Sequence, residues 1–359
     1  MRPLLITILV FAGILLLPYT VPTPPDRELN ATQLRQEAAG HNLHPIPRTR
    51  EGLLHLVDTA DNPLTPEKIA LGKRLFFDPI LSRDRTVSCA SCHILQEGGD
   101  DNRPAAVGYK GRVNPHHLNS PTVLNAALER YEFWDGRVHT VEEQAGGPIQ
   151  AHFEMNLTPR EAVERLRNDR SYREAFGQVF GENNITFANI RRAIGAYERT
   201  LLTRGPFDAF LEGNDTALSP AQKRGMTRFL ERGCAGCHAG TSVGGQFVKR
   251  FPLRRYWDDY LGFSLFPKFY WKRSEFPFDN VGDFHGRDGH DFFRVPVLRN
   301  IARTAPYFHN GAVKDLHEAV RIMSKYQLGR EFTPAEINDT VEFLKSLSGK
   351  PVDYGYDRK

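Results

Sequence analysis

Two Cys-x-x-Cys-His runs use every cysteine of this 359-residue chain: Cys89-Ala90-Ser91-Cys92-His93 and Cys234-Ala235-Gly236-Cys237-His238. This spacing is typical of covalent attachment of a c-type haem, in which two thiols form thioethers and the adjacent histidine ligates the iron. A disulfide across a two-residue gap would be strained, and a zinc site would not need a histidine directly after each second cysteine. The repetition therefore predicts two covalent haems and a redox protein.

Length and charge narrow the choice of partners. The chain is long enough for two domains of ordinary size. Its net charge of +4 is too mild to indicate a nucleic-acid partner. One denser basic stretch, around Lys249 and Arg250, favours a solvated face over a docking surface for an acidic partner.

The N-terminus differs from the rest of the chain. Arg2 precedes an apolar run from Leu4 to Leu17, which has the length of a signal-peptide core and is short for a membrane span. Residues 1–21 are therefore expected to be a signal peptide or a short N-terminal membrane anchor. Either outcome predicts a periplasmic protein, soluble after cleavage or anchored to the inner membrane. The Pro-rich, polar segment 22–50 is expected to be a tether.

The body is expected to be mainly helical, because few segments have the alternating pattern of a strand. Thr65-Pro66 and Ser219-Pro220 predict a helix start before each haem motif. Gly98-Gly99 and Gly244-Gly245 follow the motifs, so the two haem units resemble a degenerate repeat. Further helices are predicted near 158–180 and 187–203, and from a capping box at Thr333 to Gly349.

These features predict a mainly α fold of two cytochrome c-like domains, residues 51–203 and 204–359. Each domain would carry one covalent c-type haem, and the two would pack across a shared interface.

Several further runs resemble the bacterial di-haem cytochrome c peroxidases, from about Leu64 to Gly349. The runs that carry the resemblance, besides the haem motifs, are Leu71-Gly72-Lys73-Arg74-Leu75-Phe76-Phe77-Asp78, Glu132-Phe133-Trp134-Asp135-Gly136-Arg137, Glu143-Gln144-Ala145, Gly147-Pro148-Ile149-Gln150, Leu298-Arg299-Asn300, Thr304-Ala305-Pro306-Tyr307-Phe308-His309, Ala319-Val320-Arg321-Ile322-Met323 and Gln327-Leu328-Gly329.

The resemblance implies a division of labour between the haems. His93 would ligate a peroxidatic haem that reacts with hydrogen peroxide. His238 and Met323 would ligate a high-potential haem that receives electrons from a small donor protein, a cytochrome c or a cupredoxin. Ligation by His and Met raises the reduction potential of a haem.

The resemblance also implies catalytic side chains. Glu154 would be the acid–base group for peroxide, with Gln144 as its hydrogen-bonding companion. Trp134 would lie between the haems, and Phe133 near the peroxidatic pocket.

A calcium ion between the domains and a homodimer are further expectations from the resemblance. Asn119, Thr304 and Pro306 correspond to the family's calcium ligands, an Asn side chain and two backbone carbonyls. Oxygen donors of this kind suit a hard cation.

The chain departs from the family pattern at one position. Many members carry a histidine sixteen residues after the first haem histidine, as a removable ligand. Here that position is Tyr109, in Val107-Gly108-Tyr109. Three alternatives remain open: an open site, ligation by Tyr109 as phenolate, or a substitute ligand from His116 or His117. The replacement predicts less need for reductive activation.

Two rival functions remain. MauG-type di-haem oxidases, which modify residues of a partner protein, also lack the removable histidine. However, they have a tyrosine on the second haem, where this chain offers Met323. A non-enzymatic di-haem electron carrier would not need Glu154 and Gln144.

Overall fold

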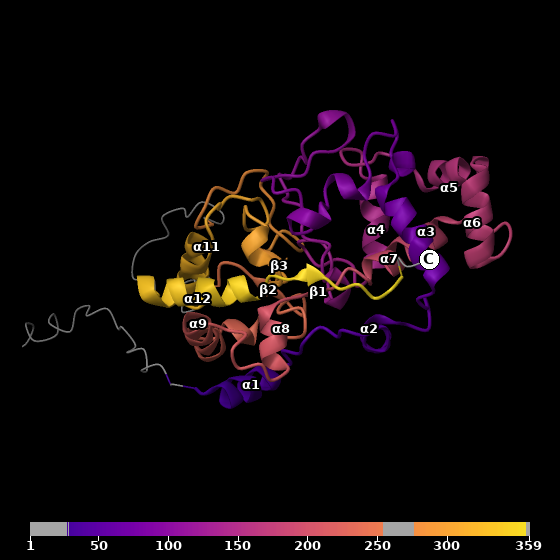
Figure 1. The fold of residues 1–359 in the computed structure, drawn as a ribbon. Helices are drawn as coiled ribbons and strands as arrows, with labels where there is room; N and C mark the ends of the chain where they lie inside the picture. Colours follow the sequence, from indigo (N-terminus) through magenta and orange to yellow (C-terminus); the bar gives the residue numbers. More distant parts are fainter. Residues whose placement is uncertain (1–26, 28, 254–275, 357–359) are drawn as a thin grey trace, which may run out of the picture.

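The computed structural model describes residue 27 and residues 29–253 and 276–356 of the chain. Figure 1 shows two groups of helices side by side, with long loops between them. The segment 1–21, expected to be a signal peptide or anchor, lies outside the described residues. Among the helices that are described, none is both long and apolar enough to cross a membrane.

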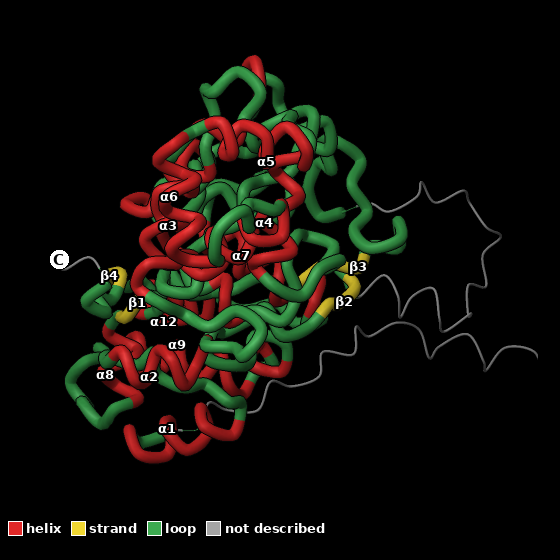
Figure 2. The backbone as a smooth tube through the Cα atoms, turned by 90° about the vertical axis from the view of Figure 1, so that its right-hand side faces the viewer, coloured by secondary structure: helices red, strands yellow, loops and turns green. Residues whose placement is uncertain are grey.

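The described part is mainly helical, with two small antiparallel sheets, β1 with β4 and β2 with β3. Figure 2 shows how much of the space between the helices is occupied by loops. The elements are α1 (Ala31–Gly40), α2 (Arg50–Val57), α3 (Pro66–Phe77), α4 (Val141–Gln150), α5 (Pro159–Asn168), α6 (Arg170–Phe180), α7 (Phe187–Glu198), α8 (Pro206–Leu211), α9 (Pro220–Glu231), α11 (Leu316–Ile322), α12 (Pro334–Ser346), β1 (Thr203–Arg204), β2 (Val248–Arg250), β3 (Phe292–Arg294) and β4 (Lys350–Pro351).

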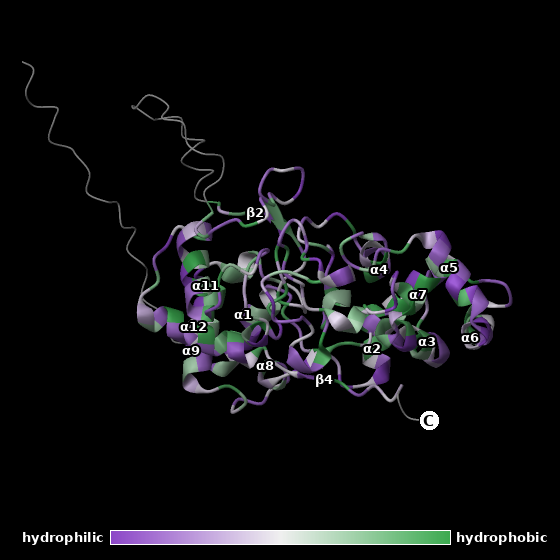
Figure 3. Cartoon of the chain, turned by 90° about the horizontal axis from the view of Figure 1, so that it is seen from above, coloured by the Kyte–Doolittle hydropathy of each residue, from purple (hydrophilic) through white to green (hydrophobic). Residues whose placement is uncertain are grey.

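The first group contains α3 to α7. The predicted start of α3 is confirmed, because the Thr65 side chain accepts a hydrogen bond from the Lys68 N–H, with Pro66 at the first position. Apolar residues of α7 face inward, whereas the outer helices α5 and α6 carry much polar surface (Figure 3). The helix predicted over 158–180 is two helices, because Asp169 ends α5 and caps α6.

The second group contains α8, α9, α11 and α12. Ser219 forms the predicted start of α9 and Thr333 that of α12, both as capping boxes. In each group the helix before the haem motif packs on a later helix through a glycine. A Cβ at Gly72 would lie 1.8 Å from the carbonyl oxygen of Ala193, and one at Gly225 would lie 1.8 Å from that of Asp339. The two units therefore share the same close helix–helix contact through a glycine.

The repeat extends into the loops between the groups. Phe133 and Phe308 both have left-handed backbone conformations, with φ of 65° and 68°. At the same spacing along the chain, other residues occupy matching places: Asn125 and Asn300, Gly136 and Gly311, Val138 and Val313, and the N-caps Thr140 of α4 and Asp315 of α11.

Two reciprocal backbone hydrogen bonds join the units. The Asn119 N–H donates to the His309 carbonyl at 2.8 Å, and the Arg294 N–H donates to the Trp134 carbonyl at 2.8 Å. Asn119 and Arg294 are matching residues of the repeat, as are Trp134 and His309. The contact is thus approximately two-fold, and it fixes Trp134 against the second unit.

The ends of the described chain pack on opposite units. Leu34 and Ala38 of α1 are fully buried in the core of the second group. Tyr354 packs in a cluster with Leu53 of α2 and Tyr197 of the first group. The tether predicted for 22–50 therefore needs correction: from Ala31 onward it belongs to the folded body, because Leu34 and Ala38 lie four residues apart on one helix face. The predicted boundary at 203/204 falls inside β1.

The close helix crossings predict that one added methyl group lowers the free energy of unfolding at Gly72 and Gly225 but not at Gly177. Gly72→Ala and Gly225→Ala should each destabilise the haem-loaded protein by about 1–3 kcal/mol, since backbone stands in the way of the new Cβ. Gly177→Ala in α6 is the control, because nothing lies within 4 Å of its added Cβ. It should be neutral or stabilise by about 0.4–1 kcal/mol. Urea denaturation measures all three, and equal effects would contradict the packing argument.

Candidate functional site

Both Cys-x-x-Cys-His motifs form a single helical turn after α3 and α9. The turns span Cys89–Ser91 and Cys234–Gly236. In each, the histidine N–H donates to the carbonyl of the first cysteine, at 3.0 Å for His93 and 2.9 Å for His238. All four cysteines are free thiols. The thioether bonds expected from the sequence stay a prediction.

The two histidines suit an iron ligand. Nδ1 of His93 lies 3.1 Å from the carbonyl oxygen of Gly99, which orients the ring and leaves Nε2 for a metal. Burial lowers the pKa of His93. Burial likewise lowers the pKa of His238 to about 4, outweighing the carbonyls of Pro296 and Val243. Both rings are therefore neutral at physiological pH, the state in which imidazole binds metal.

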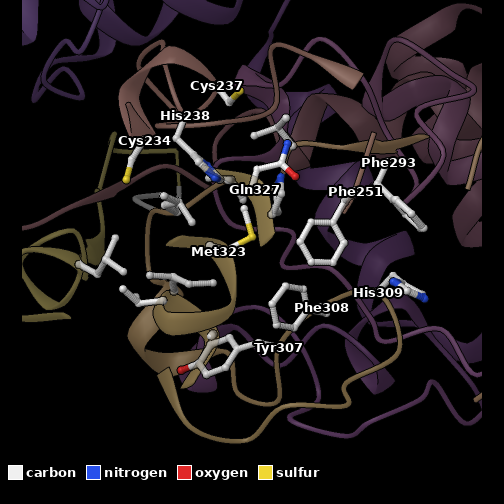
Figure 4. A pocket seen from close by; sticks show the side chains of 18 of the residues that line it. Cys234, Cys237, His238, Phe251, Phe293, Tyr307, Phe308, His309, Met323 and Gln327 are labelled. Carbon is white, nitrogen blue, oxygen red and sulfur yellow. The ribbon is translucent and has the colours of Figure 1, made fainter. Parts of the chain in front are cut away.

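A cavity lies beside the second motif. Figure 4 shows His238 and Met323 pointing into the same space, with Phe251 and Phe308 on its wall. Met323 begins a π-helical turn, Met323–Gln327, that directly follows α11; such turns are frequent at functional sites. The lining fits a haem: two thiols, an imidazole, a thioether and mostly apolar walls.

The first site is built from α4 and two loops. A Cβ at Gly147 would lie 2.7 Å from Phe133 Cζ, so the Phe133 ring packs on this face of α4. Gln144 lies three residues earlier, on the same face. The Arg137 guanidinium lies 3.5 Å from the Phe133 ring centre, and Nη1 of Arg137 binds both carboxylate oxygens of Asp135, at 2.9 and 3.0 Å.

Glu154 follows α4 and lies within the electrostatic reach of Arg137. Burial raises the pKa of Glu154 to about 7, while the Arg137 charge lowers it. A carboxyl with this pKa can both accept and return a proton near neutrality. Sequence reasoning did not single out Arg137, although it lies in a run used for the resemblance.

The repeat gives the two sites different residues at one position. Pro148 of α4 has the same place relative to its N-cap Thr140 as Met323 has relative to Asp315. A proline side chain has no atom that can ligate iron, whereas a thioether can. This position therefore carries a side chain that is able to ligate iron in the second site, and one that is unable to do so in the first.

Trp134 lines the second cavity and links it to the domain contact. Its Nε1 donates to the carbonyl of Asn119 at 2.8 Å, and its ring lies 6.4 Å from that of His309. Trp134 therefore lies at the contact of the two units, and its expected place between the haems stays a prediction.

The three residues expected to bind calcium line the same cavity. Asn119, Thr304 and Pro306 lie there together with Asp100, which sequence reasoning missed. Both carboxylate oxygens of Asp100 are buried, and neither has a hydrogen-bond partner in the described part of the chain. Burial raises the pKa of Asp100 to about 7. In residues 27, 29–253 and 276–356, no cluster of three or more His, Cys, Asp or Glu residues could hold a metal.

The Tyr109 loop is docked on Glu154. The Tyr109 N–H donates to the Glu154 carbonyl at 2.7 Å, and a Cβ at Gly108 would lie 2.5 Å from the Glu154 Cα. The Tyr109 ring lies 5.3 Å from Lys110 Nζ and 5.8 Å from Arg112 Cζ. The loop that carries Tyr109 therefore borders the first site.

His116 and His117 lie against the second unit instead. The His116 ring is 6.0 Å from that of Phe284. A Cβ at Gly282 would meet the His116 carbonyl at 2.3 Å and His117 Cβ at 2.8 Å. Their contacts favour a packing role over that of a substitute ligand.

Comparison with known proteins gives a consistent result. A family model described as di-haem cytochrome c peroxidase matches residues 66–216. The chain is 39% identical over 331 residues to cytochrome c551 peroxidase of Pseudomonas aeruginosa, covering 89% of each chain. It is 36% identical to the methylamine utilization protein MauG of Methylorubrum extorquens, over 81% of this chain and 80% of that one.

Solved structures agree. The fold is similar to that of a MauG-like protein associated with microbial copper homeostasis, with a TM-score of 0.68 and 26% identity. The match covers 84% of this chain and 96% of that one.

The cavity geometry predicts an effect of removing the thioether. Met323→Leu should lower the reduction potential of the second haem, since the soft sulfur ligand that favours ferrous iron is lost. Met226→Leu is the matched control, because Met226 is a fully buried methionine in the neighbouring core. Redox titration followed by absorption measures both. An unchanged potential in Met323→Leu would show that Met323 only packs.

Proposed function

The chain belongs to the di-haem cytochrome c peroxidase family, and we propose that it reduces hydrogen peroxide to two water molecules with electrons from a small periplasmic redox protein, a cytochrome c or a cupredoxin. It is an oxidoreductase, as its peroxidase relatives are. The observation that carries the proposal is Glu154, whose buried carboxyl has a pKa raised to about 7. It lies at the first site, where Pro148 occupies the position that Met323 has in the second site.

Two c-type haems would be held by the two motifs. Cys89, Cys92 and His93 would attach the first, and Cys234, Cys237, His238 and Met323 the second. When bound, haem iron supplies the one-electron chemistry that the side chains of this chain lack. The apolar run from Leu4 to Leu17, expected to be a signal peptide or a membrane anchor, and the two c-type haem motifs support a periplasmic location.

The proton steps belong to Glu154. Its carboxylate would accept a proton from one peroxide oxygen and return it to the other, so that the departing oxygen leaves as water. Gln144 would hold the peroxide or the carboxyl by a hydrogen bond. Phe133, packed between Gly147 and Arg137, would keep water out of the site.

The electron path would pass Trp134. Its indole is fixed by its own N–H bond to Asn119 and by the backbone bond from Arg294. An aromatic ring held at the contact of the units would offer an intermediate position for an electron that moves between the two haem motifs. Fixation of the ring would keep this position constant from one turnover to the next.

We also propose a calcium ion between the units, bound by the Asn119 side chain and the carbonyls of Thr304 and Pro306. The buried carboxylate of Asp100, which lines the same cavity and has no hydrogen-bond partner among the described residues, supports a cation there. Its charge is otherwise uncompensated in the described residues, and oxygen ligands are those that Ca²⁺ prefers.

A MauG-type oxidase is the second candidate, because Tyr109 replaces the removable histidine here as well. Met323, in the cavity beside the second haem motif, argues against a MauG-type oxidase, since those enzymes have a tyrosine as ligand of the second haem. A reduced small cytochrome and peroxide separate the two candidates. Prompt oxidation of the cytochrome supports the peroxidase, and no turnover from either oxidised or half-reduced enzyme supports the oxidase.

The raised pKa of Glu154 predicts the pH profile. The carboxylate is the proton acceptor, so kcat/KM for peroxide should rise with pH through about 7 and then level off. Glu154→Gln should remove this rise of kcat/KM with pH and lower kcat/KM by about 10²–10⁴-fold. Glu164→Gln, an exposed position on α5, should change neither. Steady-state kinetics from pH 5 to 9 would contradict the role if Glu154→Gln kept the rise.

Tyr109 predicts how the enzyme is activated. The parent should turn over peroxide from its fully oxidised form, with a high-spin ferric haem, because the removable histidine is missing. Tyr109→His should restore dependence on prior half-reduction. The measurement is the lag before turnover, started from oxidised and from half-reduced enzyme. An equal dependence of the lag on prior half-reduction in the parent and in Tyr109→His would contradict the hypothesis.

The calcium proposal predicts tight binding that depends on Asn119. Calorimetric titration of chelator-treated protein with Ca²⁺ should show one site, and Asn119→Ala should weaken it at least tenfold. Asn102→Ala, at an exposed position of the same loop region, is the control. Equal binding by both variants would exclude this site.

A further inference from the structure

Three ionisable side chains are buried together at the contact of the two units. Glu129 and Arg294 form an ion pair whose side chains are 0% and 1% exposed, and Glu132 is buried beside them. Glu129 and Glu132 belong to the first unit, and Arg294 ends β3 of the second. The peroxide chemistry described above uses none of them.

Hydrogen bonds within the cluster do not use all of its polar atoms. Oε1 of Glu129, Oε1 of Glu132 and Nε of Arg294 are buried and have no hydrogen-bond partner among the residues that the structure describes. If both carboxyls were ionised, one guanidinium would face two negative charges in a region of low polarity. A buried excess charge is costly, so a further negative charge arriving nearby would favour the binding of a proton by one of these carboxylates.

The cluster lies on the electron path. The Arg294 guanidinium carbon is 5.9 Å from the centre of the Trp134 ring, and its backbone N–H holds the Trp134 carbonyl. Arg294 and Trp134 both line the cavity that contains His238 and Met323. A Cβ at Gly245 would lie 2.4 Å from Glu129 Cγ, so the backbone of the second unit covers the cluster closely.

We propose that Glu132 is a proton-binding site coupled to the passage of electrons between the two units. An electron that arrives beside Trp134 adds a negative charge to a poorly screened region, and a proton on the Glu132 carboxylate compensates it. When the electron moves on to peroxide, the compensation is no longer needed and the proton leaves.

The step balances for each electron. The donor protein supplies one electron and water supplies one proton. The single bond that forms is O–H at a carboxylate oxygen of Glu132, and the same bond breaks when the electron passes on. Reduction of one peroxide consumes two electrons and two protons and gives two water molecules. The proposal rests on the peroxidase function, which provides these electrons.

The charges around Glu132 support this role. Burial raises the pKa of Glu132 well above its ordinary value, the charges of Glu129 and of Glu198 on α7 raise it further, and Arg294 lowers it. Glu198 is itself a buried carboxyl, and burial followed by the charge of Glu142 raises its pKa to about 8. Glu129, Arg294 and Glu198 are the charged groups that act on Glu132.

The test is a redox titration of the haem-loaded protein at several pH values, without peroxide. The reduction potential of the parent should fall as pH rises through the neutral and alkaline range, because reduction is then accompanied by proton uptake. Glu132→Gln should lose this dependence, and Glu132→Asp should restore it. Glu164→Gln is the control, because Glu164 is an exposed carboxyl of α5 and is not among the charged groups that act on Glu132; this variant should behave like the parent.

Redox-induced infrared difference spectra give a second readout. The parent should show a band of a protonated carboxyl that is missing in Glu132→Gln and present in Glu164→Gln. The proposal is overturned if the parent potential does not depend on pH, if Glu132→Gln keeps the dependence, or if Glu164→Gln loses it. Peroxide turnover is assayed separately, so a failure of the peroxidase function would not obscure the titration.

Discussion

The arrangement of the molecule depends on the two reciprocal hydrogen bonds from Asn119 to His309 and from Arg294 to Trp134. Backbone groups buried at such a contact must be paired, and here each unit pairs the groups of the other. The same residues then carry the chemistry of the interface. Asn119 accepts from the Trp134 indole through its carbonyl, and Arg294 reaches the buried Glu129. The same pair of backbone hydrogen bonds therefore both holds the units together and positions Trp134.

The repeat explains how one framework supports two different sites. At matching positions the units have Pro148 or Met323, Trp134 or His309, and Asn119 or Arg294. The first of these differences decides whether a thioether reaches the space beside the haem motif. The last decides whether a neutral amide or a fixed guanidinium lies at the contact. A few side chains on a shared backbone thus give the two sites different chemical properties.

Sequence reasoning found the features that depend on local spacing. The haem motifs, the starts of α3, α9 and α12 and the mainly helical fold follow from residues that lie close together in the chain. The break at Asp169 and the packing of Leu34 and Ala38 were missed. The carboxylates of Asp100, Glu129 and Glu132 were also missed, because their burial results from segments that are distant in sequence. No local pattern distinguishes such a carboxylate from one on the surface.

The crossed packing of the chain ends has a consequence for folding. Helix α1 completes the core of the second unit, while the segment around Tyr354 completes a cluster of the first. Neither unit can therefore finish its core before nearly the whole chain is available, and the contacts that close last span most of its length. Such long closures slow folding. They also link the stability of the halves, so that loosening either end exposes apolar surface on the opposite unit.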